Sequence, residues 1–360
     1  MPDPPGPERP GAAGAVSGEH EAGRPVLEVR DLTVEVRVGG SWLPVVEDLS
    51  LDIHRNEILG LVGESGSGKS VTALAVMGLL PEGRVRVARG EALFDGRDLL
   101  ALPARRLNAV RGAEIAMVFQ DPLTSLNPLL RVGAQVAEPL RRHRGLSRRA
   151  AAAEATRWLE RVGLPEPERL SGCYPFQLSG GMRQRVAIAT ALACGPKLLL
   201  ADEPTTALDV TVQAGILRLL GELQAEGDLS ILFVSHDLAV IAELCDRVAV
   251  MYAGQVVELA PADDLFERPR SPYAEGLLRA MPRLVTTPDS YWIEGRPPTA
   301  VDLAELTGCR FAPRCAHATP ACAEAVPPLV PSTAGGGGAG ADRSVRCIRA
   351  DELQLDGADG

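Results

Sequence analysis

The stretch Gly63-Glu64-Ser65-Gly66-Ser67-Gly68-Lys69-Ser70 lies between an apolar run at residues 58–62 and a run with helical periodicity at residues 71–80. It matches the pattern GxxxxGK[ST], in which a glycine-rich turn joins a strand to a helix. Its three glycines permit backbone conformations that turn successive N–H groups inward, and the following helix presents its positive end to the same point. The stretch therefore predicts a phosphate-binding loop in an α/β fold.

The last residues of this loop supply a charge and a hydroxyl group. The Lys69 ammonium is suited to binding the β- and γ-phosphates of a nucleoside triphosphate, and the Ser70 hydroxyl is a natural Mg²⁺ ligand. The remaining predicted phosphate contacts are Gly63, Glu64, Ser65, Gly66, Ser67, Gly68 and Val71. A glycine-rich turn without a ligand is the alternative, and the strand and helix on either side argue against it.

Two carboxylates end another apolar run, Leu198-Leu199-Leu200-Ala201-Asp202-Glu203. Ligands of open α/β sheets gather at the carboxyl ends of strands, so both side chains are expected near the nucleotide. Asp202 suits water-mediated support of Mg²⁺, whereas Glu203, one step further out, can polarise the attacking water as a general base. Either acid alone could simply cap a strand before Pro204, but the pair favours a catalytic site.

Two polar residues follow other apolar runs. Gln120 comes after residues 115–119 and heads a proline-containing loop, where its side chain could reach Mg²⁺ and sense the γ-phosphate. His236 comes after residues 231–234, where its imidazole could donate to the γ-phosphate or position the water. A histidine after a strand is also a common loop residue, so its position alone does not establish a catalytic role.

The stretch Leu178-Ser179-Gly180-Gly181-Met182-Arg183-Gln184-Arg185 lies between the two phosphate-handling segments. The order of the three motifs resembles the ATP-binding cassette (ABC) ATPases, and this implies a P-loop NTPase core that closes over ATP held by an opposite subunit. The residues implied to contact the partner's ATP are Ser179, Gly180, Gly181, Met182 and Asp209. The resemblance also assigns catalysis to Lys69, Glu203 and His236, and Mg²⁺ binding to Ser70, Gln120 and Asp202.

The chain carries one GxxxxGKS motif and one LSGG motif in 360 residues, so we expect a second subunit to complete the dimer. A net charge of −10 argues against neutralising nucleic-acid phosphates over a broad face, and no nucleic-acid partner is expected. The alternative is a soluble ABC ATPase acting on DNA or the ribosome, although such proteins tend to carry two cassettes or a long coiled coil. A third reading is a degenerate cassette that only senses nucleotide, although every expected catalytic position is present.

The domain organisation follows from changes in pattern. Residues 1–24 are rich in Pro, Gly and Ala and predict a disordered tail without a secretion signal. Residues 25–260 form the predicted nucleotide-binding domain, with an antiparallel β-subdomain where polar and apolar residues alternate over 26–53. A helical subdomain is expected at 121–178, with Ser147 as N-cap of a helix through Val162, Gly163 just beyond its end, and Ser179 at the start of the next helix. A C-terminal domain is expected at 261–360.

Residues 268–282 are similar to the extension of the oligopeptide/dipeptide (and nickel) importer ATPases. The resemblance implies an ATPase coupled to solute import, two transmembrane permease subunits and an extracytoplasmic solute-binding protein. It also implies a homologous second ATPase subunit, commonly a different chain in this family, so a heterodimer is expected. No stretch of about 20 apolar residues occurs. We therefore expect the chain at the cytoplasmic face of the cell membrane, held there by its permease partners.

Four cysteines fall in the last fifth of the chain, Cys309, Cys315, Cys322 and Cys347, with the spacing C-x5-C-x6-C-x24-C. Clustered cysteines in a reducing compartment indicate metal or redox chemistry. The spacing lacks the paired knuckles typical of zinc sites, and four thiolates can also hold an iron–sulfur cluster. The resemblance to the peptide importers implies a [4Fe–4S] cluster, with Zn²⁺ or unligated thiols as alternatives.

Adenine recognition has no evident aromatic partner in the first strand, where the sequence reads Val34-Glu35-Val36-Arg37-Val38. Family members usually carry a ring there that stacks on the base. Trp42, a few residues later, is the available aromatic side chain, and the alternative for it is a half-exposed position in a hairpin. The preference for ATP over GTP therefore rests on the resemblance.

Overall fold

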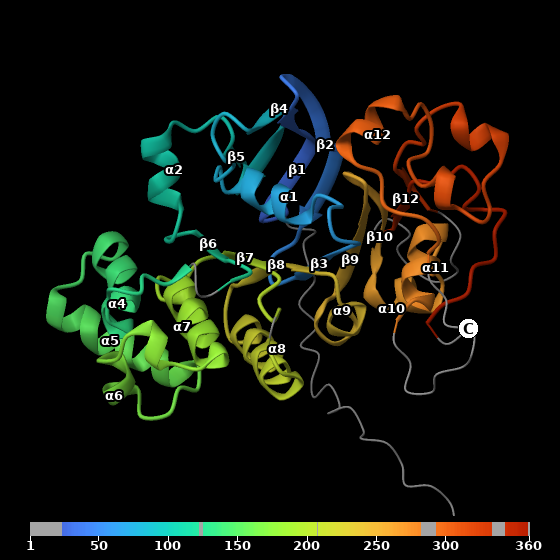
Figure 1. The fold of residues 1–360 in the computed structure, drawn as a ribbon. Helices are drawn as coiled ribbons and strands as arrows, with labels where there is room; N and C mark the ends of the chain where they lie inside the picture. Colours follow the sequence, from blue (N-terminus) through green and yellow to red (C-terminus); the bar gives the residue numbers. More distant parts are fainter. Residues whose placement is uncertain (1–23, 122–124, 207, 282–292, 333–342, 359–360) are drawn as a thin grey trace, which may run out of the picture.

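The computed structural model of the protein describes residues 24–121, 125–206, 208–281, 293–332 and 343–358. Within these residues lie two sheets with helices around them (Figure 1). The smaller sheet is antiparallel, with the strand order β2-β1-β4-β5. Its strands are β1 (Leu27–Val38), β2 (Ser41–Ile53), β4 (Val85–Phe94) and β5 (Arg97–Asp98). The first two confirm the antiparallel strands expected from the alternation over residues 26–53.

The larger sheet has the order β11-β12-β10-β9-β3-β8-β7-β6, and its five strands from β9 to β6 run parallel. These five are β9 (Arg247–Tyr252), β3 (Ile58–Val62), β8 (Ser230–Ser235), β7 (Leu198–Asp202) and β6 (Ile115–Val118). Nearly every residue in them is buried, as expected for parallel strands covered on both faces. Their carboxyl ends consequently meet along one edge of the sheet.

Helix α1 (Lys69–Val76) begins within the glycine-rich loop and ends earlier than the periodicity over 71–80 predicted. Gly78 has a φ of +61°, a left-handed conformation that stops the helix although the apolar residues Leu79 and Leu80 continue the pattern. Helix α2 (Ala104–Val110) follows strand β5. Helix α8 (Val210–Ala225) follows β7 along the chain, and helix α9 (Leu238–Leu244) follows β8 and contacts it.

A group of helices stands at one end of the larger sheet (Figure 1). It comprises α4 (Val132–His143), α5 (Arg148–Arg161), α6 (Pro167–Ser171) and α7 (Gly180–Leu192). Ser147 caps α5 as expected, because its hydroxyl accepts from the Ala150 N–H, and Gly163 beyond its end has a φ of +75°. The sequence therefore predicted both ends of α5 correctly.

The C-terminal extension adds two short strands to the other end of the larger sheet. These are β12 (Ser344–Val345), which pairs with β10 (Gln255–Pro261), and β11 (Val330–Pro331). Its helices are α10 (Ala262–Glu267), α11 (Pro272–Arg279) and α12 (Ala300–Glu305). In Figure 1 they lie on the side opposite α4–α7.

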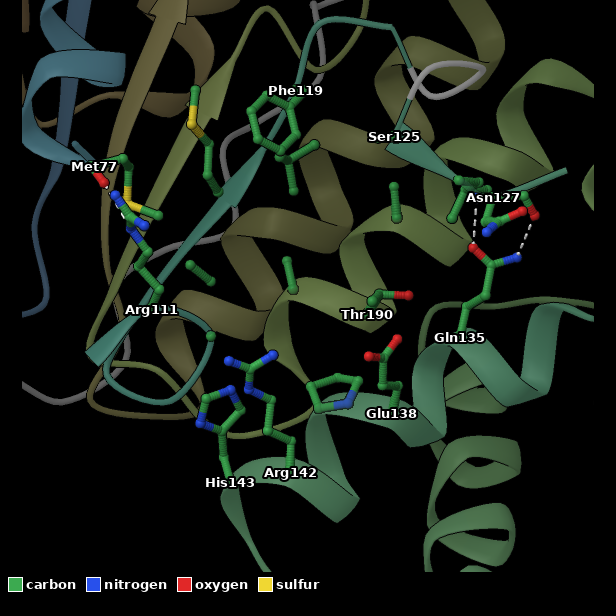
Figure 2. A pocket seen from close by; sticks show the side chains of 18 of the residues that line it. Met77, Arg111, Phe119, Ser125, Asn127, Gln135, Glu138, Arg142, His143 and Thr190 are labelled. Carbon is green, nitrogen blue, oxygen red and sulfur yellow. Dashed lines mark hydrogen bonds between the residues drawn. The ribbon is translucent and has the colours of Figure 1, made fainter. Parts of the chain in front are cut away.

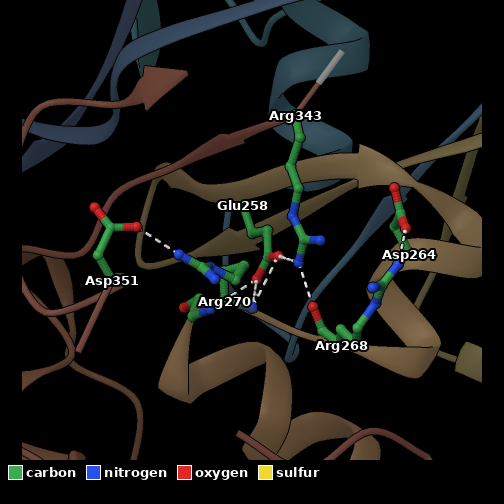
Figure 3. Close-up of polar contacts among 7 residues, drawn as sticks. Glu258, Asp264, Arg268, Arg270, Arg343 and Asp351 are labelled. Atoms are coloured by element: carbon green, nitrogen blue, oxygen red, sulfur yellow. Dashed lines mark hydrogen bonds and ion pairs between the residues drawn. The ribbon is translucent and has the colours of Figure 1, made fainter. Parts of the chain in front are cut away.

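One buried acid fastens this extension to the sheet (Figure 3). Glu258 on β10 is fully buried, and its carboxylate accepts from the Arg343 guanidinium at 2.8 Å and from the Ser271 N–H at 2.8 Å. The Arg270 N–H donates to the same carboxylate at 3.0 Å. Burial raises the pKa of Glu258, and the Arg343 charge opposes that rise. The tether therefore depends on Arg343, since without it the buried carboxylate would have no countercharge.

Among the described residues, we find no helix whose length and apolar character would let it cross a bilayer.

Candidate nucleotide site

The phosphate-binding loop joins β3 to α1 and is shaped by close approach to β9. A Cβ atom built on Gly63 would lie 2.0 Å from the Met251 carbonyl oxygen, so a larger residue cannot occupy this position without moving the backbone. Gly68, which precedes α1, has a φ of +104°, a conformation that favours glycine. Both glycines thus serve the turn that the sequence pattern predicted.

The Lys69 ammonium is held inside this loop. It donates to the carbonyl oxygens of Gly63 at 2.7 Å and Glu64 at 3.0 Å. Burial lowers the pKa of Lys69, while the carboxylates of Glu203, Asp202 and Glu64 oppose that change. A buried ammonium surrounded by three acids is well placed to exchange these partners for phosphate oxygens.

Ser70 and Asp202 meet across the gap between α1 and the end of β7. The Ser70 hydroxyl donates to Asp202 Oδ1 at 2.8 Å. Burial raises the pKa of Asp202; the Ser70 hydrogen bond and the Lys69 charge act in the opposite direction, and the neighbouring Glu203 charge adds to the rise. A nearby cation would stabilise the ionised form of the Asp202 carboxylate. The pair is one that suits an oxygen-coordinated Mg²⁺ ion.

Side chains from the ends of three neighbouring strands meet at Glu203. Gln120, after β6, donates from its amide nitrogen to Glu203 Oε2 at 2.8 Å. His236, after β8, places Nδ1 3.1 Å from Glu203 Oε1, and the Thr206 hydroxyl donates to Oε2 at 2.9 Å. The structure therefore brings together Gln120, Glu203 and His236, which lie far apart in the sequence.

The surroundings of Glu203 favour its ionised form. Burial alone would raise its pKa, but the hydrogen bonds from His236 and Thr206 and the charges of His236 and Lys69 outweigh burial, so the pKa is lowered. Its backbone has a φ of +46°, which is uncommon outside glycine and which often marks functional positions. Sequence reasoning missed Thr206; the only available signal was its position three residues after Glu203, within reach across a turn.

The LSGG segment begins α7. Ser179 is the N-cap of this helix, and its hydroxyl accepts from the Met182 N–H at 3.3 Å. A Cβ atom on Gly181 would lie 2.4 Å from Val212 Cγ1 on α8, so this glycine lets the two helices approach. Asp209 caps α8 in the same way, accepting from the Val212 N–H at 3.0 Å. Figure 1 shows α7 beside α4 and α5 and apart from α1, the helix that follows the phosphate-binding loop.

Trp42 lies on β2 opposite Arg37 of β1. The Arg86 guanidinium carbon stands 4.3 Å from the centre of the Trp42 ring, in a cation–π arrangement. One face of the indole is thus covered by another side chain. This geometry favours the interpretation of Trp42 as a hairpin residue over that of an adenine-stacking residue.

The four C-terminal cysteines gather at one small cavity. Cys309, Cys315, Cys322 and Cys347 all line it, and the Cys309 N–H donates to the Cys322 carbonyl at 2.7 Å. Burial raises the pKa of the Cys309 and Cys347 thiols, and that of Cys315 to about 11. In the described part of the chain, no three or more His, Cys, Asp or Glu side chains are arranged to hold a single metal ion.

The remaining cysteines are dispersed. Cys245 is buried, and Cys173 and Cys194 are half-buried.

Two family profiles match the chain. The ABC transporter profile matches residues 46–206, and the profile described as the oligopeptide/dipeptide transporter C-terminal region matches residues 257–322. The oligopeptide transport ATP-binding protein OppD of Salmonella typhimurium is 50% identical over 306 residues, covering 84% of this chain and 90% of that protein. OppD of Escherichia coli is 49% identical over 312 residues, covering 86% and 91%. A putative peptide import ATP-binding protein of Brucella melitensis is 46% identical over 340 residues, covering 92% and 98%.

Solved structures agree in fold. A dimeric ATP-binding cassette in a post-hydrolysis state, bound to ADP and Pi, superposes with a TM-score of 0.60 at 31% identity, covering 66% of this chain and 98% of that one. The expected fold, an ABC ATPase core with an antiparallel sheet and a group of helices, is confirmed. The chain therefore belongs to the ATP-binding proteins of the oligopeptide/dipeptide ABC transporters.

Proposed function

We propose that this chain hydrolyses ATP within a cassette dimer and couples that reaction to the import of peptides or similar small solutes through membrane subunits. The observation that carries the proposal is the convergence of Gln120, Thr206 and His236 on Glu203, beside the Ser70–Asp202 contact. The peptide-transport relatives favour this function over the alternative of an ATPase acting on DNA or ribosomes.

In this proposal Lys69 and the N–H groups of the loop residues 63–71 bind the phosphates of ATP. Ser70, Asp202 and the amide oxygen of Gln120 would hold Mg²⁺, which neutralises charge on the phosphate oxygens when bound. Glu203, kept ionised by its neighbours, accepts a proton from water as the water oxygen bonds to the γ-phosphorus and the bond to ADP breaks. His236 orients Glu203 and can donate to the γ-phosphate.

A second ATPase subunit would complete the site. The first turn of α7 carries Ser179, Gly180, Gly181 and Met182, and the helix dipole at this end favours an anion. We propose that this turn and Asp209 contact ATP held by the partner. The partner is proposed to be a homologous but different chain, since the family resemblance implies a heterodimer.

A groove beside Gln120 is the proposed contact with the permease subunits (Figure 2). Its volume is about 480 Å³, and it lies between β6 and helices α4 and α7. Apolar side chains contribute much of the lining, among them Met77, Leu79, Phe119, Leu126 and Leu130. Leu129, the chain neighbour of the lining residue Leu130, is 81% exposed, and with this apolar lining it suits a surface that a partner covers.

The rim of this groove is held in place by one side chain. Gln135 on α4 accepts from the Asn127 N–H at 2.8 Å, and its amide nitrogen donates to the carbonyls of Asn127 and Leu130 at 3.0 Å. Phe119 lines the groove, while the next residue, Gln120, contacts Glu203. A permease segment seated here would therefore contact the residue next to Gln120, whose side chain contacts the proposed catalytic base.

The assembly proposed from these contacts also includes an extracytoplasmic solute-binding protein, and the chain would lie at the cytoplasmic face of the cell membrane, bound through its permeases. We propose a nucleotide-binding domain at 25–260, with its helical part at 121–178, followed by a C-terminal domain at 261–360. The predicted tail at 1–24 lies, except for its last residue, outside the residues that the structure describes. The second family profile, which begins at residue 257, supports the boundary near residue 260.

For the cysteine cavity we propose a [4Fe–4S] cluster held by Cys309, Cys315, Cys322 and Cys347, with Zn²⁺ as the alternative. Four thiols around one cavity are the donor set of such a cluster. A lone zinc ion needs all four sulfurs within about 2.3 Å of one point, and the cavity lacks an arrangement suited to a single ion.

The function is tested by isolating the chain from detergent extracts of its native membrane. Co-purification of two permeases, together with ATP turnover stimulated by a solute-loaded binding protein, is the expected result. Association with ribosomes or DNA and no permease would contradict the proposal. Permeases without measurable ATP turnover would instead support a cassette that only senses nucleotide.

A further inference from the structure

The C-terminal extension reaches the phosphate-binding loop through one arginine. Arg314 ends the turn η2 (Ala312–Arg314), which lies between Cys309 and Cys315. Its guanidinium donates from Nη1 to Glu64 Oε2 at 2.6 Å and from Nη2 to Glu64 Oε1 at 3.0 Å. Glu64 is the second residue of the loop, so this two-pronged contact joins positions 250 residues apart in the sequence. Two parallel bonds of this kind fix orientation as well as distance.

Every nitrogen of the Arg314 guanidinium donates a hydrogen bond. Besides Glu64, its Nε donates to the Glu294 carbonyl at 2.9 Å, Nη2 to the Ile293 carbonyl at 3.2 Å, and Nη1 to the Tyr252 hydroxyl at 3.3 Å. Its side chain is only 6% exposed. All five donor hydrogens of the guanidinium therefore have an acceptor, which leaves it a single arrangement.

A second residue of the extension holds the backbone of Glu64. The Glu64 N–H donates to the Tyr273 hydroxyl at 3.0 Å, and Tyr273 is fully buried on α11. Its ring packs with those of Tyr252 and Phe311, at centre-to-centre distances of 4.5 and 5.2 Å. Phe311 directly precedes η2, so the aromatic cluster and Arg314 belong to one packed unit.

All the polar groups of Glu64 are thus engaged at once. Its carboxylate accepts from Arg314, its N–H donates to Tyr273, and its carbonyl accepts from the Lys69 ammonium at 3.0 Å. A shift of Glu64 would therefore displace Lys69. Displacements of about 1 Å near reacting groups can cost about 100-fold in rate.

We propose that Arg314 is a positioning residue for nucleotide binding, which acts through Glu64 to set the conformation of the phosphate-binding loop. In this arrangement the C-terminal extension is a structural part of the nucleotide site. The inference rests on the proposed function, since it assumes that the loop binds ATP.

Nucleotide titrations of the full-length chain test this role. Arg314→Gln and Glu64→Gln should each weaken MgATP binding by about tenfold, within the usual range of coupling between sites. The double variant should be no weaker than either single variant, because both changes remove one interaction. Arg314→Lys keeps the positive charge but cannot form the two parallel hydrogen bonds to Glu64. Its affinity for MgATP should therefore lie between those of Arg314→Gln and the unmodified chain.

Two matched controls separate positioning from general loosening. Arg296 forms an exposed ion pair with Asp302 at 3.0 Å in the same extension, and Arg296→Gln should leave the dissociation constant within about twofold. Arg343→Gln breaks the buried tether to Glu258 away from the loop, so it should lower the unfolding midpoint with a smaller loss of affinity than Arg314→Gln. Should Arg314→Gln fail to fold, Glu64→Gln and Arg314→Lys decide the matter.

Three outcomes would overturn the inference: unchanged affinity in Arg314→Gln, additive losses in the double variant, or an equal loss of affinity in Arg343→Gln. Each of these leaves the proposed function standing, because the unmodified chain still binds nucleotide. An unmodified chain that binds no MgATP would instead contradict the proposed function itself.

Discussion

The nucleotide site and the four-cysteine cavity are both assembled from distant segments, but they use different parts of the fold. Gln120, Asp202 and His236 stand at or just beyond the carboxyl ends of three parallel strands. The cysteines instead lie in turns and loops of the extension, near the short turns η2 and η3 (Pro320–Ala323). The nucleotide site is therefore held by the strands of a sheet, whereas the cysteine cavity is held by the packing of loops.

That difference has a physical consequence. Hydrogen bonds between strands hold the sheet edge, so its side chains stay close whether or not a ligand is bound. Loops have no such ladder, and a group of thiols depends on whatever binds between them. We therefore expect the nucleotide site to keep its geometry when a cysteine of the cavity is replaced. The cavity, by contrast, is expected to change its geometry when a ligand between the thiols is lost.

The largest expected effect is in the sheet-based site. Glu203→Gln should lower ATP turnover by about 1,000-fold, because the general base is lost while the phosphate contacts remain. Gel filtration with MgATP should then show a persistent dimer. The matched control is Glu222→Gln on α8, an exposed pair with Arg218 at 3.8 Å, which should leave turnover unchanged. Unchanged turnover in Glu203→Gln would refute its role as the base.

The second effect concerns the cysteine cavity. Cys309→Ser should bleach a brown absorbance at about 400 nm and lower the bound iron, measured on protein prepared without oxygen. Cys194→Ser, which changes a half-buried cysteine elsewhere, should keep both signals. Glu203→Gln should keep them too, because its site is built on other elements. Colourless protein with stoichiometric zinc would favour the zinc alternative, and colourless protein without metal would remove both.

A smaller effect is expected from the residue that sequence reasoning missed. Thr206→Val should lower turnover about tenfold, the scale of one hydrogen bond to a charged group, with little change in MgATP affinity. Thr206→Ser retains the hydroxyl that donates to Glu203 and should recover most of the rate. Equal rates for Thr206→Val and the unmodified chain would show that Gln120 and His236 suffice to hold the base.

The smallest effect is expected at Trp42. Because Arg86 covers one face of its ring, Trp42→Ala should change the MgATP dissociation constant by less than about twofold, whereas loss of a true base-stacking ring would cost about 5-fold or more. Competition between ATP and GTP for the same site provides the second measurement. A large loss for Trp42→Ala would show that the ring turns toward the base when nucleotide binds.

Much of the nucleotide site could be predicted from local sequence. The glycine-rich turn, the acids after an apolar run, and the caps Ser147 and Ser179 each depend on a few neighbouring residues. Parallel strands then bring their carboxyl ends to one edge, so Gln120 and His236 could be expected near Glu203 without knowing the coordinates. The end of α1 was predicted wrongly, because Gly78 stops the helix inside an apolar run.

Other features were decided by tertiary structure alone. The hydroxyl of Thr206 reaches Glu203 only because the turn bends back, and Arg86 covers Trp42 only because β4 pairs with β1 beside β2. The contact between Arg314 and Glu64 spans 250 residues, and no local pattern predicts that these two residues meet. The amino-acid sequence alone determined the helices and strands and their order, because caps, turns and periodicity depend on residues that are close together in the chain. Contacts between loops and distant elements depend on how the whole chain packs, so they could be read only from the fold.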